Sequence, residues 1–183
     1  MPPAQDLVQS INEGRSLLTY TGHGSTSACG TTGFSLSDIP SLTNTGELPF
    51  FWSVACVQGD FANSNCLAEG LLRATDSMGA PTGAVATLMS TINQSWDPPM
   101  DAQDEMIDLL VETYPTNIQR TFGGLSVNGC MHMNDQYGSA GNEMTDTWTC
   151  FGDPSLQVRT AQPLMLAVTH PVQIDDMTVG ITA

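Results

Sequence analysis

The chain has 183 residues, 40% of them hydrophobic, which is enough for one domain with a sizeable core. Its 19 acidic residues against four arginines and no lysine give a formal net charge of −15, which disfavours nucleic acid as a partner. No stretch approaches the roughly 20 consecutive apolar residues of a membrane-spanning helix, so no membrane span is expected.

Two short strands are predicted in the first third of the chain. The first covers residues 16–21 and ends in a Gly-His-Gly turn centred on His23. The second is the apolar run 50–55, which stops at Cys56 and then breaks into the polar residues 58–60. A buried structural cysteine usually lies inside such a run. The position of Cys56 at its end therefore raises the question of a chemical role.

A helix and a third strand follow. Apolar residues at helical spacing predict a helix over 63–75, with Asn63 or Ser64 as its N-terminal cap. The apolar run 84–89 predicts the third strand, and it also ends in a polar segment, residues 90–95. Three apolar strands thus each lead into polar residues.

The second half of the chain is predicted to be mainly helical. Residues 96–99, Trp-Asp-Pro-Pro, are expected to form a rigid loop before a helix over 100–114. A further helix is expected over 117–137, followed by extended chain at 147–150 and a strand at 155–159.

The alternation of strands and helices over residues 1–160 indicates an α/β domain with a largely parallel sheet flanked by helices. After residue 160 the pattern changes. Residues 163–171 and 172–183 form two β-type runs with no helix between them. We therefore expect residues 161–183 to be the start of a separate, truncated β module.

The carboxyl ends of the predicted strands are where chemistry is expected, because ligands of open parallel sheets bind there. If the strands are neighbours, His23 and Cys56 face one cleft. A cysteine peptidase needs this pair, because the imidazole takes the thiol proton and later protonates the leaving amine. The backbone N–H groups of Gly24 and Cys56 could then stabilise the oxyanion of the tetrahedral intermediate.

Less specific interpretations of these residues stay open. Cys56 could be a small packed hydrophobe, and Gly-His-Gly is a common turn. None of the five cysteines forms a C-x-x-C pair, so no metal site is predicted. The remaining four are expected to be structural: Cys29, Cys66, Cys130 and Cys150.

Two polar groups in the predicted helices have structural explanations. His132 lies in a Met-rich stretch that suits a helix packing face better than a soft-metal site. A set of acids suits the first turns of a helix, although calcium binding is the alternative: Asp101, Asp104, Glu105 and Asp108.

Two blocks of the sequence resemble a known family. Residues 19–25 (Thr-Tyr-Thr-Gly-His-Gly-Ser) and 48–61 resemble the His and Cys blocks of the gingipain-type cysteine peptidases. The similarity continues in order through residues 81–86, 90–96, 100, 103–106, 120–124, 146–148 and 151–160. It spans roughly residues 10–175, so it is far more specific than either short motif.

The resemblance implies a caspase-like fold and hydrolysis of protein or peptide substrates. It makes Cys56 the nucleophile and His23 the general base and acid, with oxyanion donors at Gly24 and Cys56. Substrate contacts are implied at five positions: Gly22, Ser95, Trp96, Asp97 and Met100. No cofactor is required, although calcium as a structural ion is compatible.

The resemblance also implies a location and a domain order. Members of the family are secreted or held at the bacterial cell surface. An immunoglobulin-like module follows their catalytic domain, which fits the β runs after residue 161.

Two features depart from the family pattern. The chain begins just before the His block, whereas the family's catalytic domain has a longer N-terminal half. That half supplies the acidic partner of the histidine and, in arginine-specific members, the acid at the base of the S1 pocket, so we expect it as a partner of this chain. Asp97 stands where a small or neutral residue is usual, and it could bind a basic P1 side chain or cap a turn.

The prediction is therefore a cysteine endopeptidase, for which a basic P1 residue fits both the family and the acidic composition. One alternative is a catalytically incomplete fragment or degenerate copy that acts as an interaction or structural module. Another is a different hydrolase or acyltransferase that uses the same Cys/His pair.

Overall fold

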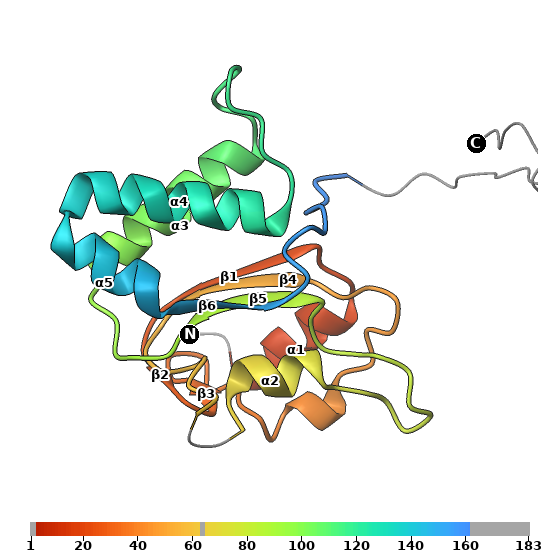
Figure 1. The fold of residues 1–183 in the computed structure, drawn as a ribbon. Coiled ribbons are helices and arrows are strands. Elements are labelled where there is room, and N and C mark those ends of the chain that lie inside the picture. The colour runs from red at the N-terminus through yellow and green to blue at the C-terminus, as the bar shows by residue number, and fades with distance from the viewer. Residues whose placement is uncertain (1–2, 63–64, 162–183) are drawn as a thin grey trace, which may run out of the picture.

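A four-stranded sheet in the order β1-β4-β5-β6 forms the centre of the computed structural model, which describes residues 3–62 and 65–161 (Figure 1). The strands are β1 (Leu17–Thr21), β4 (Phe50–Val54), β5 (Ala86–Ser90) and β6 (Trp148–Gly152). The first three run parallel, and β6 is antiparallel to β5. The predicted α/β fold with a largely parallel sheet is confirmed.

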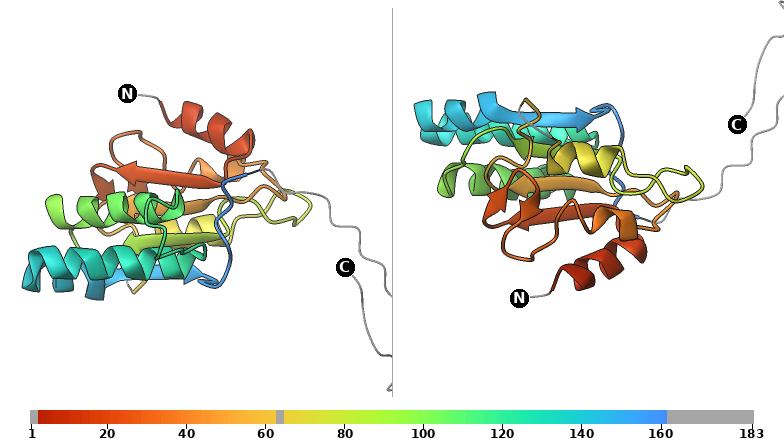
Figure 2. Two further views of the ribbon diagram at one scale, coloured as in Figure 1. Left: turned by 90° about the horizontal axis from the view of Figure 1, so that it is seen from above. Right: turned by 90° about the horizontal axis from the view of Figure 1, so that it is seen from below.

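Helices cover both faces of the sheet (Figures 1 and 2). On one face lie α1 (Ala4–Asn12) and α2 (Leu67–Leu72). On the other lie α3 (Asp97–Leu110), α4 (Phe122–Tyr137) and α5 (Ser139–Thr147). A small hairpin of β2 (Gly24–Ser25) and β3 (Ala28–Cys29) follows β1, and the 3-10 turn η1 (Ile39–Ser41) precedes β4.

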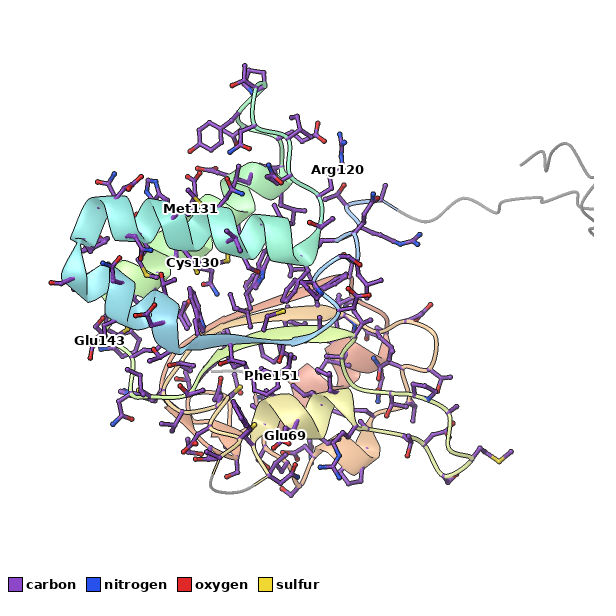
Figure 3. All side chains as sticks on the ribbon, in the orientation of Figure 1. Glu69, Arg120, Cys130, Met131, Glu143 and Phe151 are labelled. Carbon is purple, nitrogen blue, oxygen red and sulfur yellow. The ribbon has the colours of Figure 1, made fainter. Side chains whose placement is uncertain are left out.

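Strand β4 is buried along its whole length, which explains its unbroken apolar sequence. Its alternate side chains enter different cores. Phe51 packs in the cluster with α1 and α2, while Trp52 packs in the cluster with α3 and α4. Trp52 stacks on Phe122 with ring centroids 5.8 Å apart, and its Nε1 donates to Ser126 Oγ at 3.2 Å. Figure 3 shows side chains filling the space on both sides of the sheet.

The start of α3 differs from the prediction. Residues 96–99 were expected to form a loop, but α3 begins at Asp97 and has proline in its first turn. The first turn of a helix needs no backbone donor, so Pro98 and Pro99 fit there and are buried. The loop prediction was therefore wrong.

One helix was not predicted, and a second is shorter than predicted. α1 was not predicted, although Leu7, Val8 and Ile11 have helical spacing and pack on the first core cluster. The helix expected over 63–75 covers only Leu67–Leu72, with Cys66 as its N-cap residue. The suggested caps Asn63 and Ser64 lie outside the described residues.

The chain around α4 also corrects the prediction. The helix expected over 117–137 begins at Phe122, capped by the Thr121 hydroxyl, which accepts from Gly124 N at 3.1 Å. α5 was not predicted at all. Residues 155–159 are not a strand; they make only the isolated bridge Thr121↔Gln157.

The segment before Val158 provides acceptors for the unpaired donors at the start of α4. Phe122 N donates to Leu156 O at 2.8 Å, and Gly123 N donates to Pro154 O at 2.8 Å. The first N–H groups of a helix have no partner within the helix, so this segment acts as a backbone cap. The β runs predicted at 163–171 and 172–183 lie outside the described residues.

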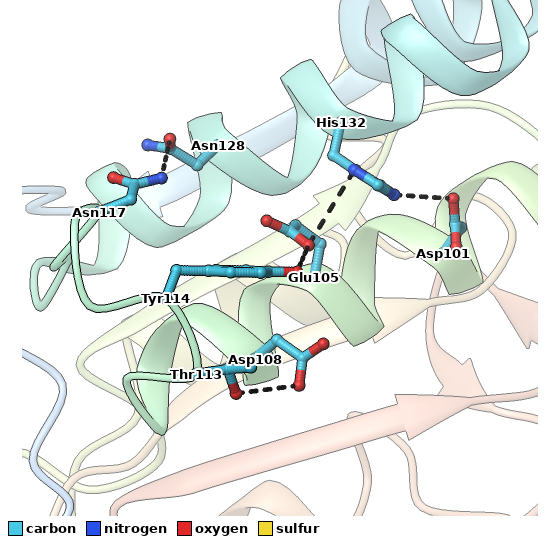
Figure 4. Close-up of polar contacts among 8 residues, drawn as sticks. All are labelled: Asp101, Glu105, Asp108, Thr113, Tyr114, Asn117, Asn128 and His132. Carbon is cyan, nitrogen blue, oxygen red and sulfur yellow. Dashed lines mark hydrogen bonds and ion pairs between the residues drawn. The ribbon is translucent and has the colours of Figure 1, made fainter.

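Polar contacts join α3 and α4 on their outer surface (Figure 4). His132 Nε2 lies 3.2 Å from Asp101 Oδ2, and its Nδ1 lies 4.0 Å from Glu105 Oε2. Tyr114 Oη donates to the same Glu105 oxygen at 2.9 Å. Within residues 3–62 and 65–161, no three His, Cys, Asp or Glu side chains form a group suited to a metal ion. The same part of the chain holds no helix long and apolar enough to cross a membrane.

Candidate active site

A pocket of about 240 Å³ lies at the carboxyl edge of the sheet, where the loops after β1, β4 and β5 meet. Its lining residues come from these three loops and from the end of β4: Gly22, His23, Val54, Ala55, Cys56, Gln94, Ser95 and Trp96. The three predicted strands are thus neighbours, and the structure brings His23 and Cys56 to one pocket. This is the edge at which open parallel sheets bind ligands.

Cys56 follows β4 by two residues and is held on a sharp turn. Ala55 N donates to Gln94 Oε1 at 3.1 Å, and Cys56 Sγ lies 3.9 Å from Gln94 O. The next residue, Val57, has a φ of 51°, a left-handed conformation that is unfavourable for a β-branched side chain. Val57 N donates to Ile92 O at 2.9 Å, so the strained turn is tied to the loop after β5. Strain of this kind is concentrated at functional sites.

Gln58 anchors the far side of this turn from a fully buried position. Its Oε1 accepts a hydrogen bond from the Ser53 hydroxyl. Its Nε2 donates to Ala28 O at 3.0 Å and lies 3.2 Å from Cys29 Sγ. Gln58 therefore joins β4, the turn after it and the hairpin that follows His23.

His23 is held by its backbone rather than by its ring. Its carbonyl oxygen accepts from Tyr20 Oη and from Gly30 N, each at 2.7 Å, and its N donates to Thr31 Oγ1 at 3.3 Å. Tyr20 Oη in turn accepts from Thr31 N at 3.0 Å. The network fixes the turn from which the imidazole projects.

The imidazole of His23 lies beside Trp96, and both residues line the pocket. Its ring meets Trp96 edge to face, with centroids 5.5 Å apart and planes at 79°. Among the described residues, no hydrogen bond joins the imidazole to Cys56 Sγ or to a carboxylate. Contacts between catalytic groups are often long in ligand-free sites and shorten when substrate binds.

The remaining predicted site residues divide into two groups. Gly22, Ser95 and Trp96 line the pocket, and Gly24 packs on the backbone of Cys56. Asp97 and Met100 lie in the first turn of α3, beyond the lining residues. Asp97 is exposed and Met100 is partly buried against the core cluster of α3 and α4.

Raised pKa values separate the other four cysteines from a reactive role. Burial raises the pKa of Cys29 to about 12 and that of Cys130 to about 11. It also raises the pKa of Cys66, and burial together with the Asp153 carboxylate raises the pKa of Cys150. A thiol with a raised pKa stays protonated near neutral pH and is a poor nucleophile.

A larger hollow of about 1200 Å³ lies at the opposite edge of the sheet, where β4 begins. Arg15 and Arg159 line it, and Arg15 pairs with Glu13 at 2.6 Å. No cysteine or histidine of the described residues lines this hollow, whereas His23 and Cys56 both line the smaller pocket.

Sequence reasoning missed several residues that shape the pocket. Gln94, Gln58, Tyr20 and Thr31 were not assigned to the site. Gln94 and Gln58 act through contacts 39 and 30 residues away in the chain, and Tyr20 and Thr31 act through hydrogen bonds around His23 that no periodic pattern reveals. Gln58 carried one weak signal, since it opens the polar stretch that follows the buried strand β4 and Cys56.

Comparison with known proteins agrees with this geometry. The sequence profile described as peptidase family C25 matches residues 2–159. The chain belongs to peptidase family C25. It is 51% identical over 172 residues to gingipain R1 of Porphyromonas gingivalis and 51% identical over 171 residues to gingipain R2 of the same species. Each alignment covers 93% of this C25 chain but only 17% and 23% of the respective relatives.

Solved structures show the same relationship. The crystal structure of the Arg-specific cysteine proteinase gingipain R superposes with a TM-score of 0.87 at 49% identity, covering 94% of this chain and 40% of that one. The complex of the P. gingivalis RgpB pro- and mature domains gives 0.85 at 50% identity, covering 94% and 41%. The C25 chain therefore has a caspase-like fold and spans part of the catalytic domain of these relatives.

Proposed function

We propose that this C25 chain carries the catalytic dyad of a cysteine endopeptidase, with Cys56 as the nucleophile and His23 as the general base and acid. The observation that carries the proposal is that both residues line one pocket at the carboxyl edge of the sheet. Family membership supports it. So do the raised pKa values of the other cysteines, which make them poor competitors.

In the proposed reaction, the Cys56 thiolate attacks the carbonyl carbon of the scissile bond and forms a C–S bond. The carbonyl oxygen becomes an oxyanion that accepts from the N–H groups of Gly24 and Cys56. The His23 imidazolium protonates the leaving amine, which releases the first product and leaves a thioester. Water then attacks the thioester while His23 takes its proton, and the acid product leaves with Cys56 regenerated.

A basic P1 side chain is the proposed preference. The gingipain R structure is that of an Arg-specific proteinase, and this chain is 49% identical to it. In this proposal Trp96 and Ser95 contact the P1 side chain from the pocket wall. Gly22 leaves room there for substrate, and Met100 and Asp97 lie behind and beside the wall at the start of α3.

The proposal extends to partners and location. The chain matches 40% of the solved gingipain R chain, so we propose that an N-terminal half completes the catalytic domain. We also propose secretion or attachment to the bacterial surface, an immunoglobulin-like module from residue 161, no required cofactor, and calcium at most as a structural ion. Each of these follows the family resemblance.

The deciding experiment measures iodoacetamide labelling of each cysteine from mildly acidic to mildly alkaline pH by peptide mass spectrometry. Wild type is compared with His23→Ala, and His132→Ala serves as the matched control because His132 lies on α4 among Asp101 and Glu105. We expect Cys56 to react much faster than the others below neutral pH, and to lose this advantage only in His23→Ala.

The other outcome favours a non-catalytic chain. If Cys56 labels no faster than an ordinary thiol and is indifferent to His23, the dyad is not assembled. The chain would then be an incomplete or degenerate copy that serves as an interaction or structural module. A panel of peptides and small esters would separate a peptidase from another hydrolase or acyltransferase that uses the same pair.

A further inference from the structure

The side chain of Gln94 makes unequal use of its two polar atoms. Its Oε1 accepts a hydrogen bond from Ala55 N at 3.1 Å, whereas its Nε2 is buried and has no hydrogen-bond partner among the described residues. Ala55 N–H is a donor, so only the amide oxygen can face it, and this fixes the orientation of the carboxamide. The unpaired edge of Gln94 is therefore an N–H donor.

An unpaired buried donor is rare in a folded protein and needs an explanation. Two other buried side-chain atoms in the described residues also have no partner, Thr82 Oγ1 and Thr87 Oγ1, and neither residue lines the pocket. Gln94 does line it, with His23 and Cys56. The residue that carries the unmet donor is thus one of those that line the pocket where a substrate is expected.

We propose that Gln94 Nε2 is a substrate-binding donor that takes a main-chain carbonyl oxygen of the peptide as its acceptor. This inference rests on the proposed function, because a peptide must be the ligand. Every residue of a peptide presents a carbonyl acceptor, so this contact recognises the peptide backbone and not the P1 side chain.

The position of Gln94 suits such a contact close to the scissile bond. Its own backbone oxygen lies 3.9 Å from Cys56 Sγ, and its side chain reaches the residue immediately before Cys56. The hydrogen bond to Ala55 N holds the carboxamide in place before substrate arrives. The donor is therefore pre-oriented, which reduces the entropy lost on binding.

The test compares two reagents that attack the same sulfur of this chain. One is a peptidyl acyloxymethyl ketone with arginine next to the reactive group, and the other is iodoacetamide, which has no peptide. The ratio of their second-order rate constants at Cys56 cancels any change in the thiol itself. Ratios are measured for wild type, Gln94→Met and Gln94→Glu, with thermal melting to confirm that each variant folds.

The two variants distinguish the effect of the acceptor Oε1 from the effect of the donor Nε2. Gln94→Met removes both, while Gln94→Glu keeps an acceptor for Ala55 N and removes the donor. Gln157→Glu is the matched control, because Gln157 is exposed and lies outside the pocket. Loss of one neutral hydrogen bond to substrate should lower the ratio about three- to tenfold in both Gln94 variants and leave the control unchanged.

The outcomes are distinct. A fall of less than about twofold in the ratio, with both rates reduced in parallel, would mean that Gln94 only positions Ala55 and Cys56, and it would overturn the inference. If wild-type Cys56 reacts no faster with the peptidyl reagent than with iodoacetamide, and its labelling rate does not depend on His23, the proposed function itself fails. The inference then fails with it. A normal wild-type ratio with an unchanged Gln94→Glu ratio overturns the inference alone.

Discussion

Gly24 packs directly on the backbone of Cys56. A Cβ atom at position 24 would lie 2.6 Å from Cys56 O and 3.0 Å from Cys56 N, and 2.9 Å from the Cβ of Ala55. Two of these neighbours are main-chain atoms, which cannot turn aside as a flexible side chain can. The hairpin after β1 and the turn after β4 are therefore in contact at the proposed oxyanion site, and only glycine permits it.

This contact predicts the effect of Gly24→Ala. The added methyl group should push the hairpin from Cys56, separate the two oxyanion donors and lower peptide hydrolysis by about 100-fold. The free energy of unfolding should fall by about 1–3 kcal/mol, as for other overpacked sites. Ser25→Ala, at the exposed neighbouring position, is the control. A Gly24→Ala protein with the wild-type rate would contradict the oxyanion assignment.

Tyr20→Phe tests the network behind His23. The lost hydroxyl leaves Thr31 N without its acceptor, while His23 O keeps Gly30 N. We expect the free energy of unfolding to fall by about 1–2 kcal/mol, and the rate of Cys56 with a peptidyl reagent to fall about threefold to tenfold. Chemical denaturation and the labelling rate of Cys56 measure the two effects.

The matched control for Tyr20 is Tyr114→Phe, which removes one hydroxyl bonded to Glu105 on the outer surface. It should change stability by less than about 0.5 kcal/mol and leave the Cys56 rate unchanged. Equal effects of the two variants would show that Tyr20 does not position His23.

His132→Ala tests the surface contact between α3 and α4 (Figure 4). His132 lies close to Asp101 and Glu105, but its side chain is 35% exposed. Exposed pairs contribute little and are screened by salt, so the loss should be below about 1 kcal/mol and should shrink further in about 0.5 M NaCl. Chemical denaturation at two salt concentrations gives the answer; a loss that grows with salt would point to packing instead.

The buried thiol of Cys29 predicts a loss of stability at high pH. Its pKa rises from 9.0 to about 12 through burial, which the hydrogen bond from Gln58 only partly offsets. The unfolded chain thus loses this proton at lower pH than the folded chain, and ionisation favours unfolding. The contribution is fully present below a pH of about 9 and is lost as pH rises towards 12.

The variant Cys29→Ala isolates this effect. It should show a shallower fall in unfolding free energy over the same pH range, whatever its stability at neutral pH. Ser27→Ala is the comparison, because Ser27 is exposed and its side chain does not titrate in this pH range. Identical slopes in wild type and Cys29→Ala would exclude Cys29 as the source.

Local sequence pattern was sufficient for several features of the fold and the site. The three parallel strands, the helices near 100–114 and 117–137, and the edge at which His23 and Cys56 meet were all predicted from apolar runs and their polar ends. These signals work because burial of β4 on both faces demands an unbroken apolar sequence.

Local pattern failed where tertiary contacts decide. Residues 154–158 have extended sequence, but they cap α4 instead of joining the sheet. Pro98 and Pro99 suggest a loop, but they fit the first turn of α3. Gln94 lies in the polar segment predicted after the third strand, but no local pattern distinguishes it from its neighbours, because its contact with Ala55 lies 39 residues away.

The direction of strand β6 determines where the chain after the peptidase fold begins. It runs against β5, from Trp148 beside Ser90 at the pocket end to Gly152 beside Ala86 at the other. At a rise of about 3.4 Å per residue, these two ends lie roughly 14 Å apart. Whatever is joined after residue 161, whether a natural module, a reporter or an affinity tag, therefore starts away from the pocket end of the sheet (Figure 1). The pocket therefore lies at one end of the sheet, and the last residue that the structure describes lies at the other.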